Sequence, residues 1–420
     1  MVAYQTLIVP LVSFLLFIIF LQKRRSTAAP QPRKRLPPSP RKLPIIGNLH
    51  QLGVYPHRSF QALSRRYGQL MLLHLGQVPV LVVSSADAAC EIMKNQDLIF
   101  SNRPKLSIPD RLTYGSRDVA FVPYGEYWRK ARSICVLQLL SNKRVDGLDA
   151  KVERVAKLFD EFLEGVLQEH RDRKKGEKIC DEDFGGDGGL DFVDILLEFQ
   201  RENKGSSPVE VDTIKAIILD VFGAGTDTTS TVLEWAMTEL LRYPSVMKKL
   251  QTEVREIVKH QQDITDNDLE KMQYLKAVIK ETLRFHTPIP LLVPRQARKD
   301  VKIMGYDISA GTMVITNAWA ICRDPVSWDE PEKFEPDRFL NSSIDFKGLD
   351  FELIPFGAGR RGCPGITFAM ATTEFVLANL VKKFDWKLPD EGKELDMKER
   401  PGVAVRREVP LLAAATLYRS

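Results

Sequence analysis

Cysteine is scarce in this sequence, and its spacing excludes several classes of site. The 420 residues contain five cysteines, scattered along the chain without a C-x-x-C pair: Cys90, Cys135, Cys180, Cys322 and Cys363. A disulfide scaffold needs cysteines at framework spacing, and a tetrahedral zinc or iron–sulfur site needs several thiolates close together. The sequence therefore predicts neither, and we expect the folded part to face a reducing compartment.

Charge is absent from the first 22 residues, where Leu7 to Leu21 form a nearly continuous apolar run. This length suits a helix that crosses a bilayer. Lys23 to Arg25 follow at once, and such charges stay on the cytoplasmic side, so residues 1–22 are predicted to be a transmembrane signal anchor. The alternative is a cleaved signal peptide with the small residues 26–29 as its cleavage site. A signal peptide, however, carries its positive charge before the apolar run.

Clustered charge is also missing from the chain. The net charge is only +5 at pH 7, which suits an acidic partner or anionic lipid but lacks the clustering that nucleic-acid binding needs. We therefore expect no nucleic-acid partner. Residues 23–44 are basic and rich in proline, so they are predicted to be a stiff linker. The chain is 44% hydrophobic, enough for a substantial core in residues 45–420.

Strand patterns are few, and helical patterns dominate from about residue 86 onward. The predicted helices include residues 145–170, 211–242, 244–260, 269–286 and 364–383. The predicted strands are residues 70–75, 78–83, 301–308 and 313–315. The sequence thus predicts a mainly α fold with a small β region, in one large domain.

One stretch, FGAGRRGCPG at residues 356–365, allows two interpretations. Gly357, Gly359 and Gly362 match G-x-G-x-x-G, which binds dinucleotides where a strand precedes the glycines and a helix follows them in a βαβ unit. Pro355 stands where that strand would end, and few residues remain after the stretch. A dinucleotide-binding protein therefore stays open as the less favoured alternative.

The second interpretation concerns Cys363. Glycines let a loop wrap closely around a flat ligand, and positive charge nearby stabilises a thiolate. Gly359 and Gly365 provide that room, and Arg361 provides the charge. Pro364 would begin a helix whose positive end lies beside the sulfur. A single thiolate in such a loop suits haem iron.

The predicted helix at residues 211–242 contains the unusual sequence FGAGTDTTST at its centre. Small residues and threonines are poor helix formers, so this composition reduces helix stability. Asp227 and Thr228 would place a carboxylate and a hydroxyl beside a gap at Ala224 and Gly225, where they could relay protons. The structural alternative is a kinked core helix whose threonines bond back to the preceding turn.

Two further patterns involve arginine. Glu281 and Arg284 lie three residues apart, and Arg338 could complete a buried Glu–Arg–Arg cluster with them. Trp128 and Arg132 lie one helical turn apart and could offer an N–H and a guanidinium to an anion. Taken singly, both patterns are more common as a surface ion pair and as an amphipathic helix with an aromatic anchor.

Taken together, FGAGRRGCPG, ETLR, FEPDRF, AGTDTT and WRKAR, with PPSPRKLPIIGNLHQLG after the apolar start, resemble a plant microsomal cytochrome P450 of family 71, closest to subfamily A. The resemblance implies that Cys363 is the axial thiolate of the haem iron, and that Asp227 and Thr228 deliver protons for O–O cleavage. The residues implied to hold the haem are Trp128, Arg132, Arg295 and Arg361 at its propionates, and Phe356, Gly359 and Gly365 in the cysteine loop.

The resemblance also implies partners and a location. The expected cofactor is haem b, and NADPH would supply electrons through NADPH–cytochrome P450 reductase, with cytochrome b5 as a second candidate donor. Oxygen from O2 would be inserted into a small hydrophobic plant metabolite of the terpenoid, alkaloid or phenylpropanoid type. The protein would cross the endoplasmic reticulum membrane once, with its catalytic domain in the cytosol. The implied pocket walls are residues 107–121, 219–228, 288–293 and 402–405.

The sequence departs from the family pattern near Val145 and Asp146. In the family, several helices separate WRKARSICVLQLLSNKRV from the stretch that here begins DGLDAKVERVAKLFDEF; in this chain the two are joined directly. We expect the loss of these helices to expose apolar surface and to open the substrate pocket to water. An internally deleted, inactive variant is therefore an alternative to an active monooxygenase.

Overall fold

The computed structural model describes residues 34–138, 152–176, 192–202, 209–259, 263–389 and 395–418. The predicted anchor at residues 1–22 and the junction of Val145 and Asp146 lie outside these ranges. Within them, no helix combines the length and the apolar character that crossing a bilayer requires.

Helices make up most of the described chain. The longer ones are α2 (Pro56–Tyr67), α5 (Glu126–Gln138), α6 (Val152–Gly176), α7 (Phe192–Glu202), α8 (Val211–Arg242), α9 (Pro244–Ile257), α11 (Gln273–Phe285) and α13 (Ile366–Lys383). The shorter ones are α3 (Ala86–Cys90), α4 (Ser107–Leu112), α10 (Asp266–Lys271), α12 (Ala318–Ile321), η1 (Leu49–Gln51), η2 (Glu91–Asn95), η3 (Pro336–Phe339) and η4 (Gly359–Arg361). The predicted mainly α fold is confirmed.

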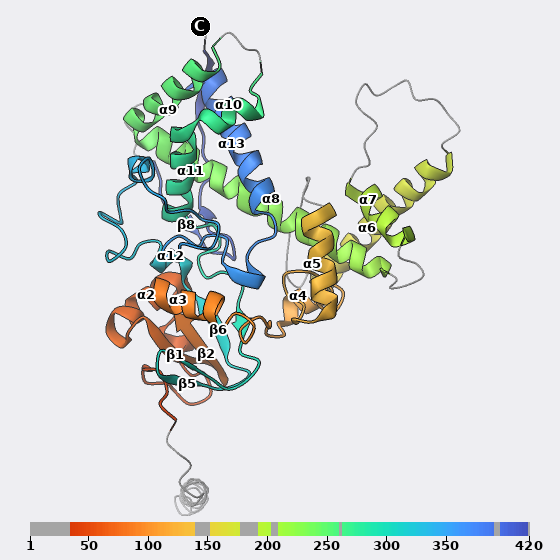
Figure 1. Cartoon of the computed structure of the whole chain (residues 1–420), viewed down its shortest axis with the longest axis vertical. Helices are drawn as coiled ribbons and strands as arrows, with labels where there is room; N and C mark the ends of the chain where they lie inside the picture. The colour runs from red at the N-terminus through yellow and green to blue at the C-terminus, as the bar shows by residue number, and fades with distance from the viewer. Residues whose placement is uncertain are drawn as a thin grey trace, which may run out of the picture.

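The main hydrophobic core lies where α8, α9, α11 and α13 meet (Figure 1). Apolar residues at helical spacing fill it, among them Ala236 and Leu240 of α8 and Leu250 and Val254 of α9, all fully buried. Full burial of one leucine side chain stabilises the fold by about 1.5–3 kcal/mol. This packing fixes the C-terminal half of α8 and thereby the position of its centre.

The N-terminal half of α8 belongs to a second cluster, which it forms with α5, α6 and α7. Figure 1 shows α6 and α7 to one side of the body, with α8 running between the two parts. The buried Lys215 of α8 places its Nζ 2.6 Å from Asp160 Oδ1 and 2.7 Å from Glu164 Oε2, both on α6. Because a buried ammonium needs paired charges, these contacts hold α6 against α8.

Strands form small sheets in the described chain. They are β1 (Leu70–Leu75), β2 (Val78–Val83), β3 (Arg295–Gln296), β4 (Val301–Ile303), β5 (Tyr306–Ile308), β6 (Met313–Thr316), β7 (Phe384–Lys387), β8 (Glu399–Arg400), β9 (Arg406–Arg407) and β10 (Ala414–Leu417). The largest sheet has the order β1-β2-β6-β3. Its β1–β2 hairpin turns at Gly76, whose φ of +61° suits glycine. Its β2–β6 pair is parallel, with Val80 opposite Met313.

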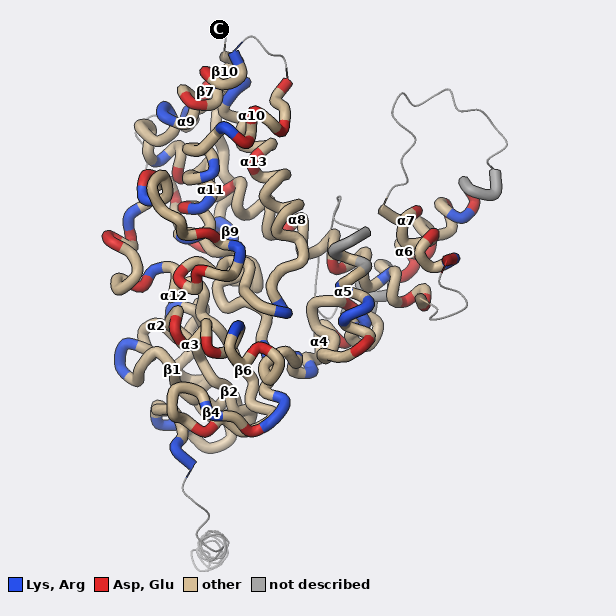
Figure 2. Tube along the Cα trace, in the orientation of Figure 1, with Lys and Arg blue, Asp and Glu red and all other residues tan. Residues whose placement is uncertain are grey.

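Basic and acidic residues are interspersed along the described chain (Figure 2). Several pairs tie distant segments together, such as Lys34 with Asp300 at 2.9 Å and Arg255 with Asp385 at 2.8 Å. Basic and acidic residues are therefore mixed along the trace in Figure 2.

The segment before the glycine-rich stretch is not a strand. Residues 351–358 form turns and irregular backbone, and no strand precedes η4 in this stretch of the described chain. A helix, α13, follows, but the βαβ unit that a dinucleotide fingerprint needs is absent here. The dinucleotide interpretation is therefore wrong, and Pro355 was the signal against it.

The C-terminal hairpin β8–β9 is fixed to α2 by Glu399. The Glu399 carboxylate accepts from Arg58 Nη2 at 2.7 Å, and its backbone carbonyl accepts from the Tyr55 hydroxyl at 2.6 Å. Burial raises the pKa of Glu399, but the neighbouring His57 and the charge of Arg58 outweigh it and lower the pKa to about 2.

We expect Glu399→Gln to lower the free energy of unfolding at pH 7 by up to roughly 3 kcal/mol. The folded-state pKa lies below the unfolded value, so this stabilisation is present above about pH 4.5 and lost as the pH falls toward 2. Urea unfolding at pH 7, 4 and 3 should therefore show the wild type and the variant converging. Glu408→Gln, which changes an exposed glutamate next to β9, is the control. Equal stability of the wild type and Glu399→Gln at pH 7 would contradict the stabilising role of the Glu399 carboxylate.

Candidate functional site

Cys363 lies in a tight loop between η4 and α13. Its N–H donates to the carbonyl of Phe356 at 2.9 Å, and its Sγ accepts from the N–H of Gly365 at 3.3 Å. Burial raises the pKa of the Cys363 thiol, while the Gly365 N–H and the charge of Arg132 lower it. The loop thus holds the sulfur in one direction and provides a donor to it.

Gly359 makes the close approach of this loop to η2 possible. Its φ is +64°, and a Cβ at this position would lie 2.1 Å from the carbonyl oxygen of Met93. Asp97 accepts from the next backbone N–H, that of Arg360, at 3.1 Å. A side chain at residue 359 would therefore push the loop away from the segment that holds it.

We expect Gly359→Ala to destabilise the protein by at least ~2 kcal/mol, because a left-handed conformation costs roughly 1–2 kcal/mol for a residue with a Cβ and the contact with Met93 adds to it. Gly311→Ala is the matched control: its φ is +80°, but its Cβ would have no neighbour within 4 Å. Urea unfolding of both variants separates the two costs. Equal destabilisation would show that the close approach is unimportant.

A cavity of about 520 Å³ lies between the cysteine loop and the centre of α8. Seven of the predicted site residues line it: Arg132, Thr228, Arg295, Phe356, Arg361, Cys363 and Gly365. Trp128, Asp227 and Gly359 do not. The remaining wall is mostly apolar and includes Val119, Ala224, Ile289 and Leu292. Residues 402–405 are not part of this wall; the carbonyl of Val405 instead accepts from the indole N–H of Trp235 at 3.1 Å.

Four guanidinium groups line the cavity, and one of them, that of Arg103, was not predicted from the sequence. Arg103 lies buried and donates to the carbonyls of Ala120, Val293 and Pro294. Burial and the charges of Arg361 and Arg295 hold the pKa of Arg103 well below its usual value. No local pattern in the sequence marks Arg103, because it follows a short turn and precedes a proline.

The predicted cationic residues differ in how their donors are used. Arg361 donates to the carbonyls of Ser101, Val119 and Val122, and burial with the charges of Arg295 and Arg132 lowers its pKa to about 9. Arg295 donates to Asp97 at 3.1 Å and to the carbonyl of Ala358 at 2.6 Å.

Arg132 is the guanidinium best placed for an external anion. Within the described chain it makes no hydrogen bond or ion pair, and its contact is with the ring of Trp128, 5.5 Å from the centroid. The N–H of Trp128 donates to the carbonyl of Val119 at 3.2 Å and is thus already used. The Trp128 ring thus contacts the guanidinium groups of both Arg132 and Arg361.

The centre of α8 forms the opposite wall. The hydroxyl of Thr228 donates to the carbonyl of Ala224 at 2.7 Å, and that of Thr231 donates to the carbonyl of Asp227 at 2.7 Å. The threonines thus bond back to the preceding turn, as the structural alternative anticipated. The Asp227 carboxylate turns to Arg406 of β9 and forms an ion pair with it. Thr228 therefore faces the cavity while Asp227 does not.

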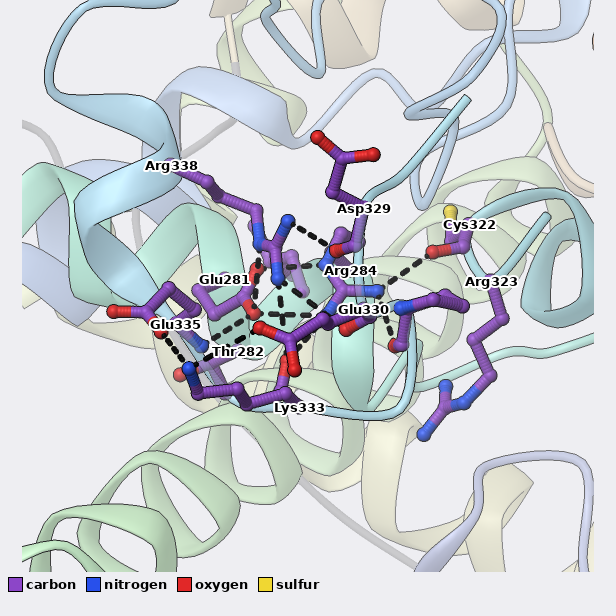
Figure 3. A network of polar contacts seen from close by, with 12 residues as sticks. Glu281, Thr282, Arg284, Cys322, Arg323, Asp329, Glu330, Lys333, Glu335 and Arg338 are labelled. Carbon is purple, nitrogen blue, oxygen red and sulfur yellow. Dashed lines mark hydrogen bonds and ion pairs between the residues drawn. The ribbon is translucent and has the colours of Figure 1, made fainter. Parts of the chain in front are cut away.

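The predicted Glu–Arg–Arg cluster is confirmed, and it joins α11 to the segment that contains Arg338 (Figure 3). The fully buried Arg284 donates from Nε and Nη2 to Glu281 at 2.6 and 2.8 Å. Arg338 Nε donates to the same carboxylate at 3.2 Å. Arg284 also donates to the carbonyls of Cys322, Pro331 and Lys333. One buried pair thus organises residues 322–338.

These groups fit a haem. A flat anionic ligand in this cavity would have a thiol on one side, the small residues of α8 on the other, and guanidinium groups at its edge. Burial and, after it, the charges of Arg295 and Arg132 lower the pKa of Arg361, and carboxylates such as propionates would relieve this repulsion. Cys363 would hold the iron, and Arg132 and Arg103 would face the propionates.

The comparisons with known proteins agree with this arrangement. The family model Cytochrome P450 matches residues 37–156 and 145–413. The chain belongs to the cytochrome P450 family. It is 48% identical to Cytochrome P450 71A6 of Nepeta racemosa over 511 residues, covering 98% of this chain and 99% of the relative. It is 44% identical to (+)-menthofuran synthase of Mentha piperita, covering 97% and 98%.

Solved structures give the same fold. A zebrafish cytochrome P450 solved with abiraterone is 25% identical, has a TM-score of 0.72, and is matched over 87% of this chain and 100% of that one. The plant relatives confirm the resemblance to plant family 71, and the protein is a cytochrome P450 oxidoreductase. Family membership implies haem iron as its cofactor and O2 with a small molecule as its ligands.

Proposed function

We propose that this cytochrome P450 is a haem-thiolate monooxygenase that inserts one oxygen atom from O2 into a small hydrophobic plant specialised metabolite of the terpenoid, alkaloid or phenylpropanoid type. The observation that carries the proposal is that Cys363, Arg132 and Thr228 share one cavity. A haem bound there supplies the iron centre at which O2 is activated.

The residues of the chain have separate tasks in this proposal. The Gly365 N–H and the start of α13 stabilise the Cys363 thiolate. The Thr228 hydroxyl donates to the carbonyl of Ala224 and holds a proton at the cavity wall where O2 would be activated. Asp227 is the second proton carrier, and its ion pair with Arg406 fixes the position of its carboxylate. The apolar wall at Ile289 and Leu292 orients the substrate and excludes water.

Electrons would come from NADPH through a reductase that docks near the cysteine loop, with cytochrome b5 as a second candidate donor. The uncharged residues 1–22 and the basic linker 23–44 support a single-pass anchor in the endoplasmic reticulum membrane, with the catalytic domain in the cytosol. The name of one relative, (+)-menthofuran synthase, states its product, and this supports a small apolar substrate.

We further propose that the chain lacks several helices between Val145 and Asp146. Two observations support this: the family model matches in two parts that meet at residues 145–156, and the alignment with Cytochrome P450 71A6 extends over 511 residues although the chain has 420. An inactive, internally deleted variant is the second candidate function.

The test is the carbon monoxide difference spectrum of the reduced full-length protein in membranes, followed by NADPH turnover with a plant reductase. A Soret band at the long wavelength of thiolate-ligated haem, with product formation, supports the monooxygenase. The same band without turnover supports the inactive variant. Absence of the band overturns the haem-thiolate proposal itself. Sequencing the transcript across codons 145 and 146 checks the deletion independently.

A further inference from the structure

Asp220 stands out on the cavity wall because it is the only acidic residue that lines it within the described chain. The other charged residues on that wall are Arg103, Arg132, Arg295 and Arg361. Their positions near the cysteine loop assign them to the anionic edge of a haem. Asp220 comes from α8 instead, on the wall opposite Cys363, where the substrate would lie.

The two carboxyl oxygens of Asp220 have different surroundings. Oδ2 accepts from the N–H of Val119 at 2.6 Å and from that of Ala120 at 3.4 Å. Oδ1 accepts no hydrogen bond from the described chain, and it is not among the fully enclosed unpaired atoms. One oxygen therefore fixes the side chain to the segment before α5, and the other has accessible surface in the cavity.

Covering Oδ1 of Asp220 with a substrate is unfavourable unless the substrate forms a hydrogen bond with it. A polar atom that loses water without gaining a partner destabilises the complex, and the cavity wall that contains Asp220 also includes the apolar side chains of Val119 and Val221. A wholly hydrocarbon substrate would cover this oxygen without compensation. A substrate with one polar group at this position would not.

The helix geometry sets the distance of that polar group from the reaction. Asp220, Ala224 and Thr228 follow at intervals of four residues and all line the cavity, so they share one face of α8. Eight residues of helix span about 12 Å. A polar group at Asp220 would therefore lie roughly 12 Å along α8 from the Thr228 hydroxyl.

We propose that Asp220 binds a hydroxyl group of the substrate, so that the preferred substrate is an otherwise apolar alcohol oxidised at a carbon remote from that hydroxyl. This inference rests on the proposed monooxygenase function and names the substrate class for the same site. A hydroxyl suits the site because it can both donate to a carboxylate and accept from a carboxylic acid.

Charge favours a hydroxyl over an ammonium group. Four guanidinium groups and only one carboxyl group line the described cavity, and this excess of positive charge disfavours a cation. Burial and the negative charge of Asp118 also hold the pKa of Asp220 well above its usual value, which favours a neutral partner. A cationic ligand is thus the competing possibility that the experiment must separate.

The experiment measures dissociation constants from the Soret shift of the haem-loaded full-length protein, with three probes of equal chain length. These are 1-decanol, decane and the decyltrimethylammonium ion, which carry a hydroxyl, no polar group, and a charge without a donor. We expect 1-decanol to bind about tenfold more tightly than decane, the factor that 1.4 kcal/mol represents. Tightest binding of decyltrimethylammonium would overturn the hydroxyl assignment.

Variants separate recognition from structure. Asp220→Ala should reduce the decanol-to-decane preference to about one, whereas Asp220→Asn, which can still bond Val119 and a hydroxyl, should retain most of it. Asp212→Asn, an exposed aspartate on the same helix, is the control and should leave the preference unchanged. An unchanged preference in Asp220→Ala would overturn the proposal, because a merely structural role would alter both affinities alike.

A measurement on the wild type covers the case in which Asp220→Ala does not fold. With its hydroxyl at Asp220, 1-decanol should be oxidised in the half of its chain remote from the hydroxyl; oxidation mainly beside the hydroxyl would overturn the proposal. The carbon monoxide spectrum distinguishes the two levels of failure. Without the thiolate-type band, both the proposed function and this inference fail; with the band but without the decanol preference, only this inference fails.

Discussion

Cys363→Ser should abolish the long-wavelength Soret band of the reduced carbon monoxide complex and reduce product formation by more than about a hundredfold. Loss of an outer partner of a metal ligand already costs roughly 10–100-fold in affinity or activity, and here the ligand itself is removed. A serine hydroxyl stays protonated at neutral pH and cannot provide the electron density of a thiolate. The fold should be retained, because serine fits where Cys363 is only partly buried.

The matched control is Cys90→Ser, a second partly buried cysteine, on α3 and away from the cavity wall. It should leave the spectrum and the turnover unchanged. Circular dichroism at 222 nm would confirm that both variants remain helical. Retention of the thiolate-type band in Cys363→Ser would show that another cysteine binds the iron; Cys135, which also lines the cavity, would then be the candidate.

Arg284→Met should destabilise the protein by about 3–5 kcal/mol, the cost of removing one partner from a buried ion pair. The variant leaves the Glu281 carboxylate buried and takes away the donors to the carbonyls of Cys322, Pro331 and Lys333. Marginally stable domains have only 5–15 kcal/mol in total. We therefore expect this variant to accumulate poorly and to contain little haem.

Lys276→Met is the control for Arg284→Met, because it removes one positive charge from the same helix at a partly buried position. An exposed pair or contact of this kind is worth about 0–1 kcal/mol, so its urea midpoint should stay close to that of the wild type. A similar small effect of Arg284→Met would mean that the cluster in Figure 3 does not hold the fold together.

Much of the fold could be predicted because local pattern and tertiary packing agree. The helix expected at residues 211–242 has those bounds in the structure, and so do the strands expected at 70–75 and 78–83. Apolar spacing, a glycine turn and a proline after the last turn set these limits. The helix expected at 269–286 is instead divided at Met272, because a Thr265–Asp268 capping box begins a separate short helix, α10.

Side-chain direction at the site could be predicted only in part. Cys363 and Thr228 face the cavity as expected, because their own loop and helix determine where they point. Asp227 does not, since its direction depends on Arg406, which lies far along the chain. Arg103 was missed for a related reason, because it donates to a backbone carbonyl of a distant segment, which no local pattern reveals. Asp220 lies in the expected pocket wall 219–228, but its bond from the Val119 N–H was not predicted.

The parallel pairing of β2 with β6 joins residues 80–83 to residues 313–316. The chain between these two strands is therefore one long loop that the pairing closes. The entropy of closing a loop grows only with the logarithm of its length. Lengthening or shortening this loop by about a third would change the free energy of closing it by only roughly 0.3 kcal/mol. Insertions or deletions within this loop can therefore change the cavity wall while the pairing of β2 with β6 is retained.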